Sequence, residues 1–247
     1  MSLLSLTGVT CRFGGITALN NLTLDLPQGA ITGVIGPNGA GKTTLFNCIT
    51  GAYRPSEGEI RLRGESLVGL APHRIARLGV ARTFQNIRLF PSMTVWEHLM
   101  VVQRGGGLRA ALAPLGLSGA APRRRAEQAL ERFGLAPFRD RLATTLPYGV
   151  MRRVELARAL TAEPSLLLLD EPVAGMNHEE AASLATLLHG LVAEGLTLLL
   201  IEHDMGFVEQ LCQQVHVLDF GTLIASGTPA EVRRIPAVID AYLGVEG

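Results

Sequence analysis

The chain has 247 residues, of which 47% are hydrophobic and 18% are charged. This composition excludes intrinsic disorder, and a chain of this length can bury a core without disulfides or metals. The 22 basic residues balance 22 acidic ones, so the chain as a whole has no electrostatic attraction to nucleic acid or anionic lipid. Cys11, Cys48 and Cys212 are far apart and form no metal or disulfide pattern, which favours a reducing compartment.

No segment predicts insertion into a membrane. Residues 1–9 lack the basic and apolar regions of a signal peptide. The longest apolar runs, Leu166–Leu169 and Leu196–Ile201, have the length of buried strands and fall far short of the ~20 residues of a membrane-spanning helix. We therefore expect a soluble protein, which would serve a membrane only from its surface.

The first third of the chain predicts strands that lead into a glycine-rich loop and a helix. Alternation of apolar and polar residues is clearest at Leu22, Leu24 and Leu26. A proline at the first turn favours a short helix from Pro72. We expect strands at residues 3–9, 18–26, 30–35 and 59–62, and helices at 42–50 and 72–78.

A mainly helical segment, residues 86–160, interrupts this pattern, with helices expected at 94–102, 122–133 and 151–161. Residues 103–122 are small, glycine-rich and apolar, without a clear period. Strands then return at 166–169, 196–201, 215–218 and 223–225, alternating with helices at 178–193 and 206–212. The tail, residues 229–243, predicts two short helices separated at Pro236. Apolar strands that alternate with helices predict an α/β fold with a mainly parallel sheet covered on both faces.

Residues 36–43 read G-P-N-G-A-G-K-T and fit the pattern G-x-x-x-x-G-K-[ST] between an expected strand and an expected helix. Glycines let successive N–H groups curve around an anion, and the helix N-terminus adds its positive end. Lys42 is the only lysine among the 22 basic residues, and its compact ammonium suits the β- and γ-phosphates of a nucleotide. The Thr43 hydroxyl can ligate Mg²⁺. The residues expected to bind nucleotide in this loop are Gly36, Asn38, Gly39, Ala40, Gly41, Lys42, Thr43 and Thr44.

Two acidic residues, Asp170 and Glu171, follow the four leucines of the strand at 166–169. Ligands bind at the carboxyl ends of strands in parallel α/β sheets, and the phosphate loop lies at the same end of its own strand. We expect Asp170 to belong to the Mg²⁺ shell. Glu171 is placed to polarise a water in line with the γ-phosphate.

The motifs between and around these residues resemble those of ABC (ATP-binding cassette) ATPases, in an order that covers nearly the whole chain. Residues 146–153, L-P-Y-G-V-M-R-R, resemble the signature segment; Arg82–Gln85 resemble the Q-loop, and Ala174–Asn177 the D-loop. His203 stands in the switch-histidine position, and Phe13 where the family stacks an aromatic ring on adenine.

The resemblance implies a P-loop NTPase core with ATP and Mg²⁺ as cofactors, an antiparallel β subdomain and an inserted helical subdomain. The core would comprise residues 1–85 and 161–247, and the helical subdomain with the signature residues 86–160. It implies catalytic roles for Glu171, His203 and Gln85, and Mg²⁺ ligation by Thr43, Gln85 and Asp170. Tyr148 and Gly149 of the signature would contact a second subunit's ATP.

Three further segments resemble the ATPases of branched-chain amino-acid importers: residues 79–90, residues 93–99 and the tail at 227–243. The resemblance implies a homodimer, or a heterodimer with a second ABC ATPase, on two transmembrane permease subunits. A periplasmic binding protein would take part indirectly, and nucleic acid would not. The chain would lie in the cytoplasm, on the inner face of a bacterial plasma membrane. An aromatic and apolar group would either line a groove for a permease helix or form core: Phe84, Phe90, Met93 and Trp96.

The signature departs from the family pattern. Pro147 stands where serine is usual and has neither a hydroxyl nor a backbone N–H, Val150 replaces glutamine, and Asn177 replaces the D-loop aspartate. Lys42 and Glu171 match the family pattern. We therefore expect the site built on these two residues to hydrolyse ATP, with the signature supplied by a partner.

The sequence bears differently on several other functions. A GTP switch needs an N-K-x-D motif, which a chain whose only lysine is Lys42 excludes. A small-molecule kinase would not need the signature, Q-loop and switch histidine in this order. ABC proteins of translation or DNA repair usually carry two cassettes or long coiled-coil insertions. A lipid or lipopolysaccharide export ATPase, and a cassette that binds ATP with weak turnover, remain as alternatives.

Overall fold

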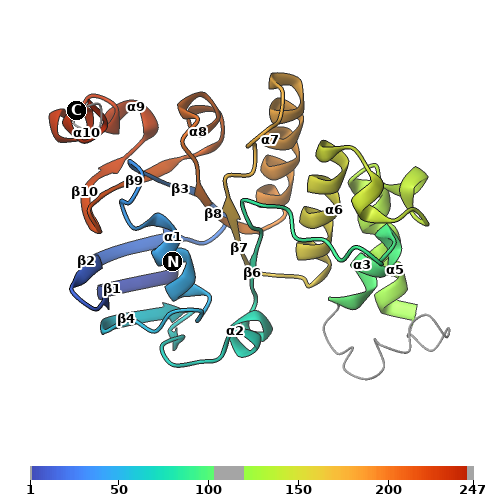
Figure 1. Cartoon of the computed structure of the whole chain (residues 1–247), viewed down its shortest axis with the longest axis horizontal. Coiled ribbons are helices and arrows are strands. Elements are labelled where there is room, and N and C mark those ends of the chain that lie inside the picture. The colour runs from blue at the N-terminus through green and yellow to red at the C-terminus, as the bar shows by residue number, and fades with distance from the viewer. Residues whose placement is uncertain (1, 103–119, 244–247) are drawn as a thin grey trace. The chain divides into compact units, whose positions relative to one another are not determined.

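The computed structural model describes residues 2–102 and 120–243 (Figure 1). The chain divides into two compact units, residues 1–80 with 165–247, and residues 81–164. The sequence-based division had its boundaries after residues 85 and 160. Most of the glycine-rich segment at 103–122, namely residues 103–119, lies outside the described residues.

The first unit contains a four-stranded antiparallel sheet in the order β2-β1-β4-β5. Leu4 of β1 pairs with Leu26 of β2 on one side and with Leu62 of β4 on the other. The expected alternation is present, since Leu22, Leu24 and Leu26 are buried while Thr23 and Asp25 are exposed. The strands are β1 (Ser2–Phe13), β2 (Ile16–Pro27), β4 (Glu57–Leu62) and β5 (Glu65–Ser66).

A second, six-stranded sheet has the order β10-β9-β3-β8-β7-β6. The pairs β3–β8, β3–β9 and β7–β8 are parallel, and β9–β10 is an antiparallel hairpin. Every residue of β3, β7 and β8 is buried, as expected for strands covered on both faces. The strands are β3 (Ile31–Ile35), β6 (Val80–Arg82), β7 (Leu166–Asp170), β8 (Thr197–Ile201), β9 (Gln214–Asp219) and β10 (Thr222–Gly227).

One hydrophobic core joins the two sheets through α1 (Lys42–Ile49). Leu45 and Phe46 of α1 belong to the same buried cluster as Leu4 of the small sheet and Leu199 of the large one. Figure 1 shows α7 (His178–Ala193) and α8 (Met205–Leu211) on the opposite side of the large sheet from β1, β2 and β4. This burial fixes α1, and with it the loop that precedes α1, against both sheets.

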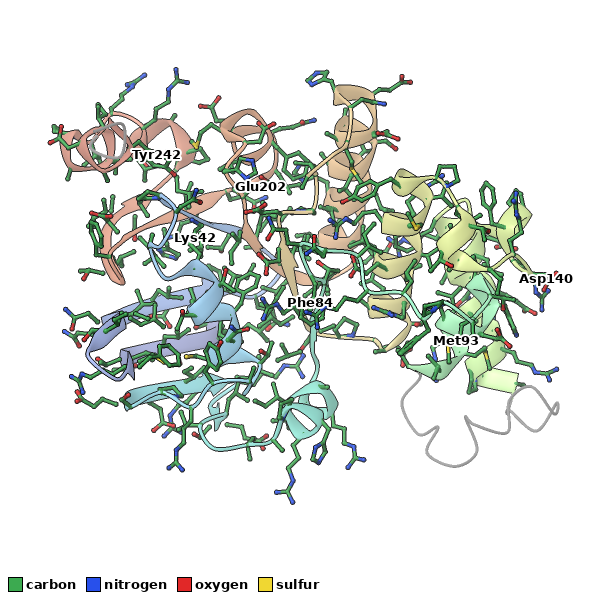
Figure 2. The ribbon with its side chains drawn as sticks, viewed as in Figure 1. Lys42, Phe84, Met93, Asp140, Glu202 and Tyr242 are labelled. Atoms are coloured by element: carbon green, nitrogen blue, oxygen red, sulfur yellow. The ribbon has the colours of Figure 1, made fainter. Side chains whose placement is uncertain are left out.

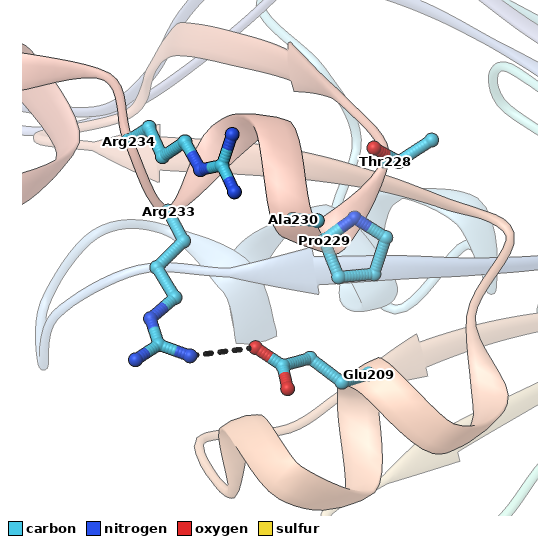
Figure 3. A pocket seen from close by; sticks show the side chains of 6 residues that line it. All are labelled: Glu209, Thr228, Pro229, Ala230, Arg233 and Arg234. Atoms are coloured by element: carbon cyan, nitrogen blue, oxygen red, sulfur yellow. Dashed lines mark hydrogen bonds and ion pairs between the residues drawn. The ribbon is translucent and has the colours of Figure 1, made fainter.

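The remaining helices of the first unit are short. Helix α2 (Pro72–Leu78) has the expected bounds, with its proline in the first turn, and Gly79 caps its C-terminus. The tail forms α9 (Pro229–Val232) and α10 (Pro236–Leu243), with Pro236 opening the second helix. Beside α9, Glu209, Thr228, Pro229, Ala230, Arg233 and Arg234 line a shallow pocket (Figure 3). Arg233 forms an ion pair with Glu209 of α8 at 3.1 Å, which ties the tail to α8, although such exposed pairs contribute little stability.

The second unit is helical. It contains α3 (Val95–Val101), α5 (Ala120–Arg132) and α6 (Tyr148–Thr161), and each of these three helices contacts the other two. Two short 3₁₀ turns, η2 (Ala136–Phe138) and η3 (Ala143–Thr145), connect α5 to α6. Helix α6 begins three residues earlier than expected, because the carbonyl of Pro147 accepts hydrogen bonds from Val150 (2.9 Å) and Met151 (3.0 Å) and starts the helix.

The fold matches the expected α/β architecture, with a mainly parallel sheet, an antiparallel sheet and an inserted helical unit. Within residues 2–102 and 120–243, none of the helices has the length and hydropathy of a membrane span.

Candidate functional site

The phosphate loop runs from the end of β3 to the start of α1. Gly41 caps α1 with φ of 99°, and a Cβ there would lie 2.4 Å from the carbonyl oxygen of Ala18. At Gly36, with φ of 145°, a Cβ would lie 2.1 Å from the carbonyl oxygen of Leu218. Only glycine fits at these two positions. The loop is therefore pressed against β2 and the end of β9, which leaves its backbone N–H groups in a fixed arrangement.

Lys42 folds back over this loop. Its Nζ donates hydrogen bonds to the carbonyl oxygens of Gly36 (2.6 Å) and Pro37 (2.9 Å). Burial lowers the pKa of Lys42, while the carboxylates of Glu171 and then Asp170 act in the opposite direction. The ammonium group therefore lies in the electrostatic field of both acids predicted from the sequence. Figure 2 labels Lys42 where α1 begins.

The other loop residues differ in exposure. Asn38 and Gly39 are exposed, and Ala40 is buried with its N–H donating to the Pro37 carbonyl oxygen at 3.2 Å. Thr43 is exposed and Thr44 is half-buried, both in the first turn of α1. The exposed hydroxyl of Thr43 is thus accessible to a ligand at the helix N-terminus.

Asp170 is the last residue of β7 and is 7% exposed. Glu171 follows with φ of 46°, in the left-handed region that a non-glycine residue rarely adopts. Its N–H donates to the carbonyl oxygen of Ile201 at 2.9 Å, continuing the ladder between β7 and β8. Such a conformation costs about 1–3 kcal/mol and persists only where the surroundings impose it. The turn therefore sets the direction of the Glu171 side chain.

His203 lies beside Glu171. Its Nδ1 is 3.8 Å from Glu171 Oε1 and 3.6 Å from Glu202 Oε2. The structure thus brings together four residues singled out from the sequence in the first unit: Lys42, Asp170, Glu171 and His203.

Glu202 is a residue that the sequence analysis missed. Its side chain is fully buried, and it accepts hydrogen bonds from the backbone N–H groups of His203 (2.9 Å), Asp204 (3.2 Å) and Val173 (3.3 Å). Figure 2 labels it at the end of β8. A buried carboxylate at the end of an apolar strand, next to a candidate catalytic histidine, is the signal that could have identified it.

Phe13 is 43% exposed at the end of β1 and meets the ring of Tyr53 edge-on, with the ring centroids 5.0 Å apart. Tyr53, which the sequence analysis did not consider, is 40% exposed in the turn after α1. The two rings form a partly exposed aromatic surface of the kind that can stack on a base.

The tail also reaches the phosphate loop. The Tyr242 hydroxyl in α10 is hydrogen-bonded to the backbone of Gly36, which lowers the pKa of Tyr242, although burial has the larger effect and raises it. The sequence predicted no contact between this tail and the phosphate loop, only a resemblance of the tail to importer ATPases. Figure 2 labels Tyr242 in α10.

Asn177, at the expected D-loop, caps α7. Its Oδ1 accepts from the Glu180 N–H at 2.9 Å, while a Glu180 carboxylate oxygen accepts from the Asn177 N–H at 3.0 Å. This capping box explains why asparagine serves at this position, since asparagine is among the best N-cap residues.

The second unit carries the remaining candidates. Gln85 is exposed, and its carbonyl oxygen accepts from Arg152 at 2.9 Å. Tyr148, 40% exposed, and Gly149 form the first turn of α6. Pro147 is the N-cap of this helix and makes no side-chain hydrogen bond to it. The helix start is therefore available to an anion.

The described residues contain no group of three or more His, Cys, Asp or Glu side chains that could hold a metal ion. Mg²⁺ does not require one, because it usually binds one or two protein ligands, several waters and substrate phosphates. The Thr43 hydroxyl and the Asp170 carboxylate, beside a loop shaped for phosphate, are a donor set of this kind.

Two family models match the chain. One, described as ABC transporter, matches residues 19–174, and another, described as branched-chain amino acid ATP-binding cassette transporter, matches residues 222–247. Among known proteins, the high-affinity branched-chain amino acid transport ATP-binding protein LivG of Escherichia coli K12 is 46% identical over 250 residues, covering 98% of each chain. The lipopolysaccharide export system ATP-binding protein LptB of Haemophilus influenzae is 33% identical over 244 residues, covering 99% of this chain and 98% of LptB.

Solved structures agree with this assignment. A nucleotide-free ATP-binding cassette from an ABC transporter superposes with a TM-score of 0.87 at 30% identity, covering 98% of this chain and 99% of the other. A dimeric ATP-binding cassette in a post-hydrolysis state, bound to ADP and phosphate, gives a TM-score of 0.78 at 26% identity, with 92% and 98% coverage. The chain therefore belongs to the ABC transporter family, as an ATP-binding and ATP-hydrolysing subunit.

Proposed function

We propose that the chain hydrolyses ATP to drive an importer of branched-chain amino acids across a bacterial plasma membrane. The observation that carries this proposal is the 46% identity to LivG over 98% of both chains. The tail, residues 222–247, also matches the branched-chain amino acid cassette model. ABC ATPases do not contact the transported solute, so the substrate rests on these similarities.

The residues of the first unit divide the chemistry among them. Lys42 and the loop N–H groups bind the β- and γ-phosphates, and the exposed rings of Phe13 and Tyr53 stack on adenine. Thr43 and Asp170 would hold Mg²⁺, with Gln85 of the second unit as a further ligand implied by the family resemblance, and the ion would neutralise charge on the phosphates. Glu171 polarises the attacking water as general base.

His203 acts beside Glu171. The Nδ1 of His203 lies 3.8 Å from the Glu171 carboxylate and 3.6 Å from that of Glu202. The other ring nitrogen, Nε2, is therefore the one left to bind the γ-phosphate. A hydrogen bond to that group would strengthen as charge develops on it during hydrolysis. The buried Glu202 holds the backbone of the histidine through its N–H group and places a carboxylate near the Nδ1 side of the ring.

Two ATPase subunits would meet head to tail, as a homodimer or with a second ABC ATPase. The first turn of α6, with Tyr148 and Gly149, would approach the γ-phosphate held by the partner. The helix start has no side-chain cap of its own, which supports this use. Pro147 removes one donor from the signature, so this chain offers its partner fewer hydrogen bonds than the usual serine would.

The permease would contact the second unit. Phe90 is 49% exposed, whereas Phe84 is half-buried. The guanidinium carbons of Arg82 and Arg88 lie 5.0 and 4.4 Å from the centre of the Phe84 ring. Met93 and Trp96 are also half-buried, and Arg139 lies 4.2 Å from the Trp96 ring. Phe90 is thus the member of this group best placed to meet a permease helix on the cytoplasmic side of the membrane. A periplasmic binding protein would act only through the permeases.

The experiment that tests the transported solute replaces Lys42 by alanine in the gene of the source organism. Uptake of radiolabelled leucine, isoleucine and valine should fall to background, while an unrelated amino acid is taken up normally. Normal uptake together with a lipopolysaccharide defect would instead favour the lipid-export alternative. This alternative ranks second because the identity to LptB, 33%, is lower than the identity to LivG, 46%.

Subunit association is tested with Glu171→Gln, in light scattering with and without saturating Mg-ATP, and with Lys42→Ala as the non-binding control. A dimer that forms only with ATP supports homodimeric closure through the Pro147 signature. A monomer that binds ATP indicates an obligate partner ATPase. Slow turnover with tight ATP binding in the assembled complex would favour the alternative of a cassette that binds ATP but hydrolyses it only weakly.

A further inference from the structure

A fully buried ion pair lies within the helical unit, on the helix that begins with the signature. The Arg152 side chain is 0% exposed and that of Glu155 is 1% exposed, and Arg152 Nη1 is 2.8 Å from Glu155 Oε2. Burying two charges is costly unless further hydrogen bonds satisfy both groups. Neither residue has a part in the hydrolysis proposed for the first unit, and the reason for burying both lies in their other contacts.

The guanidinium of Arg152 binds the backbone of the Q-loop. Its Nη1 donates to the carbonyl oxygen of Phe84 at 2.8 Å, and its Nη2 donates to that of Gln85 at 2.9 Å. These are two short hydrogen bonds from one charged fork to consecutive carbonyl groups. The Gln85 backbone is therefore fixed to α6 on the Arg152 side.

Glu155 faces the same segment. Its Oε1 lies 3.5 Å from the backbone nitrogens of both Phe84 and Arg88, at the outer limit of a hydrogen bond. Its other oxygen, Oε2, accepts from Arg152. The pair thus contacts the N–H groups of Phe84 and Arg88 and the C=O groups of Phe84 and Gln85, in a segment without regular secondary structure.

Arg152 also reaches the first turn of its own helix. Its Nη2 donates to the Tyr148 hydroxyl at 3.3 Å, and its guanidinium carbon lies 5.9 Å from the centre of the Tyr148 ring. One side chain therefore contacts Gln85, Glu155 and Tyr148 simultaneously. A guanidinium with five donors in a planar fork can do this, whereas an ammonium group cannot match the geometry.

We propose that Arg152 is a positioning residue that locks Gln85 to the first turn of α6, so that the Q-loop and the signature move as one piece. The inference rests on the roles given above to Gln85 and Tyr148. Gln85 would face the chain's own ATP, while the signature would face the partner's ATP. Binding of ATP at the chain's own site would then change, through Arg152, the position of the signature that faces the partner's ATP. The contact between Arg152 and Tyr148 would carry this change to the signature.

The test compares Arg152→Lys with Val154→Ala. Lysine retains the charge beside Glu155 but loses the fork, whereas Val154, which is 0% exposed on the same helix, is a core position whose truncation destabilises the same unit. Hydrogen exchange of the full-length protein is measured over residues 82–90 and 146–151, with and without Mg-ATP. ATP binding and hydrolysis are measured in the same preparations.

In the wild type, Mg-ATP should slow exchange in both segments. In Arg152→Lys, exchange over residues 82–90 without nucleotide should be about tenfold faster, as expected when hydrogen bonds to a charged group are lost. Mg-ATP should then protect residues 82–90 but no longer residues 146–151. The kcat should fall about tenfold with the Kd for ATP within twofold, while Val154→Ala should lower the Tm and leave the exchange pattern and kcat near those of the wild type.

Joint protection of both segments in Arg152→Lys would overturn the inference, as would equal effects of Arg152→Lys and Val154→Ala. Tyr148→Phe, which removes only the hydroxyl, should weaken the joint protection in the same direction. A wild type that binds ATP without hydrolysing it would refute the proposed function. The exchange pattern would still decide the role of Arg152 in that case.

Discussion

The buried carboxylate of Glu202 accepts a hydrogen bond from the backbone N–H of His203 at 2.9 Å and lies 3.6 Å from the Nδ1 of the same residue. Glu202 therefore holds the main chain of the histidine that faces Glu171, while the ring itself is 67% exposed and only near the Glu202 carboxylate. Catalytic residues must be held firmly in place, because a small displacement of a reacting group strongly lowers the reaction rate.

Replacing Glu202 by glutamine should lower kcat about tenfold and leave ATP affinity within twofold, since a misplaced His203 weakens only interactions made during hydrolysis. Glutamine keeps only one acceptor oxygen, so its NH2 group would face either the Val173 N–H or the N–H groups of His203 and Asp204, all of which now donate to the carboxylate. Steady-state kinetics provide the measurement. Glu209→Gln, on the exposed face of α8, is the matched control and should behave as the wild type. An unchanged kcat in Glu202→Gln would show that the histidine needs no such support.

Lys42 predicts a specific pH dependence of ATP binding. Burial lowers its pKa from the ordinary value of 10.5. Because only the protonated ammonium attracts phosphate, ATP affinity should begin to fall at a pH below that ordinary value as the pH is raised. The Kd measured from pH 7 to pH 10 provides the check. Lys42→Met should bind weakly throughout, without this dependence, and a wild-type Kd that stays constant up to pH 10 would contradict the account.

The cysteines should be unreactive in the folded protein. Burial raises the pKa values of Cys48 and Cys212 to about 12, and Cys11 is 1% exposed. The thiolate is the reactive form, and a pKa about 3 units above normal reduces its fraction roughly 10³-fold. A thiol reagent at pH 8 should therefore modify none of the three until denaturant is added. Rapid modification of any one in the native protein would be inconsistent with this burial.

His98 should make the protein less stable in acid. Its ring is fully buried, with Nε2 accepting from the Phe90 N–H and Nδ1 facing the Thr94 carbonyl oxygen, each at 2.8 Å, which defines a neutral tautomer. Burial lowers its pKa below the ordinary 6.5. The unfolded chain therefore binds more protons as the pH falls below 6.5, and the free energy of unfolding decreases.

The Tm should accordingly decline from pH 7 to pH 5. Burial also lowers the pKa of His216, so both residues contribute to the slope. His98→Gln should be less stable at pH 7 but should lose less Tm on acidification than the wild type. An equal slope in the two proteins would assign the acid sensitivity to other groups.

The parts of the fold that the sequence predicted are those governed by local pattern. Helices α2 and α7 have the expected bounds because a proline or a capping asparagine starts each one. The start of α6 was placed three residues late, since the sequence offered no capping side chain and the helix begins on the Pro147 carbonyl group. Strands β5 and β6 were missed, because two- and three-residue strands have too few positions to show alternation.

The candidate site divides in the same way. The phosphate loop and Asp170–Glu171 were predictable because the residues that form each motif are consecutive in the sequence. Glu202 had a local signal, its place at the end of an apolar strand beside His203, although its contact with the Val173 N–H is tertiary. Tyr53 and Tyr242 had none, since their contacts depend on the ring of Phe13 and the backbone of Gly36. No pattern within one segment reports contacts between segments so distant in the sequence.

The most direct test of the account is ATP hydrolysis by the purified protein and by Glu171→Gln, with ATP binding measured in the same preparations. The strained backbone at Glu171 and its position beside His203 predict that this carboxylate activates water. The variant should bind ATP as the wild type does and turn over ~10²–10⁴-fold more slowly, the loss expected for a general base. Equal turnover in the two proteins would remove Glu171 from catalysis and contradict the mechanism.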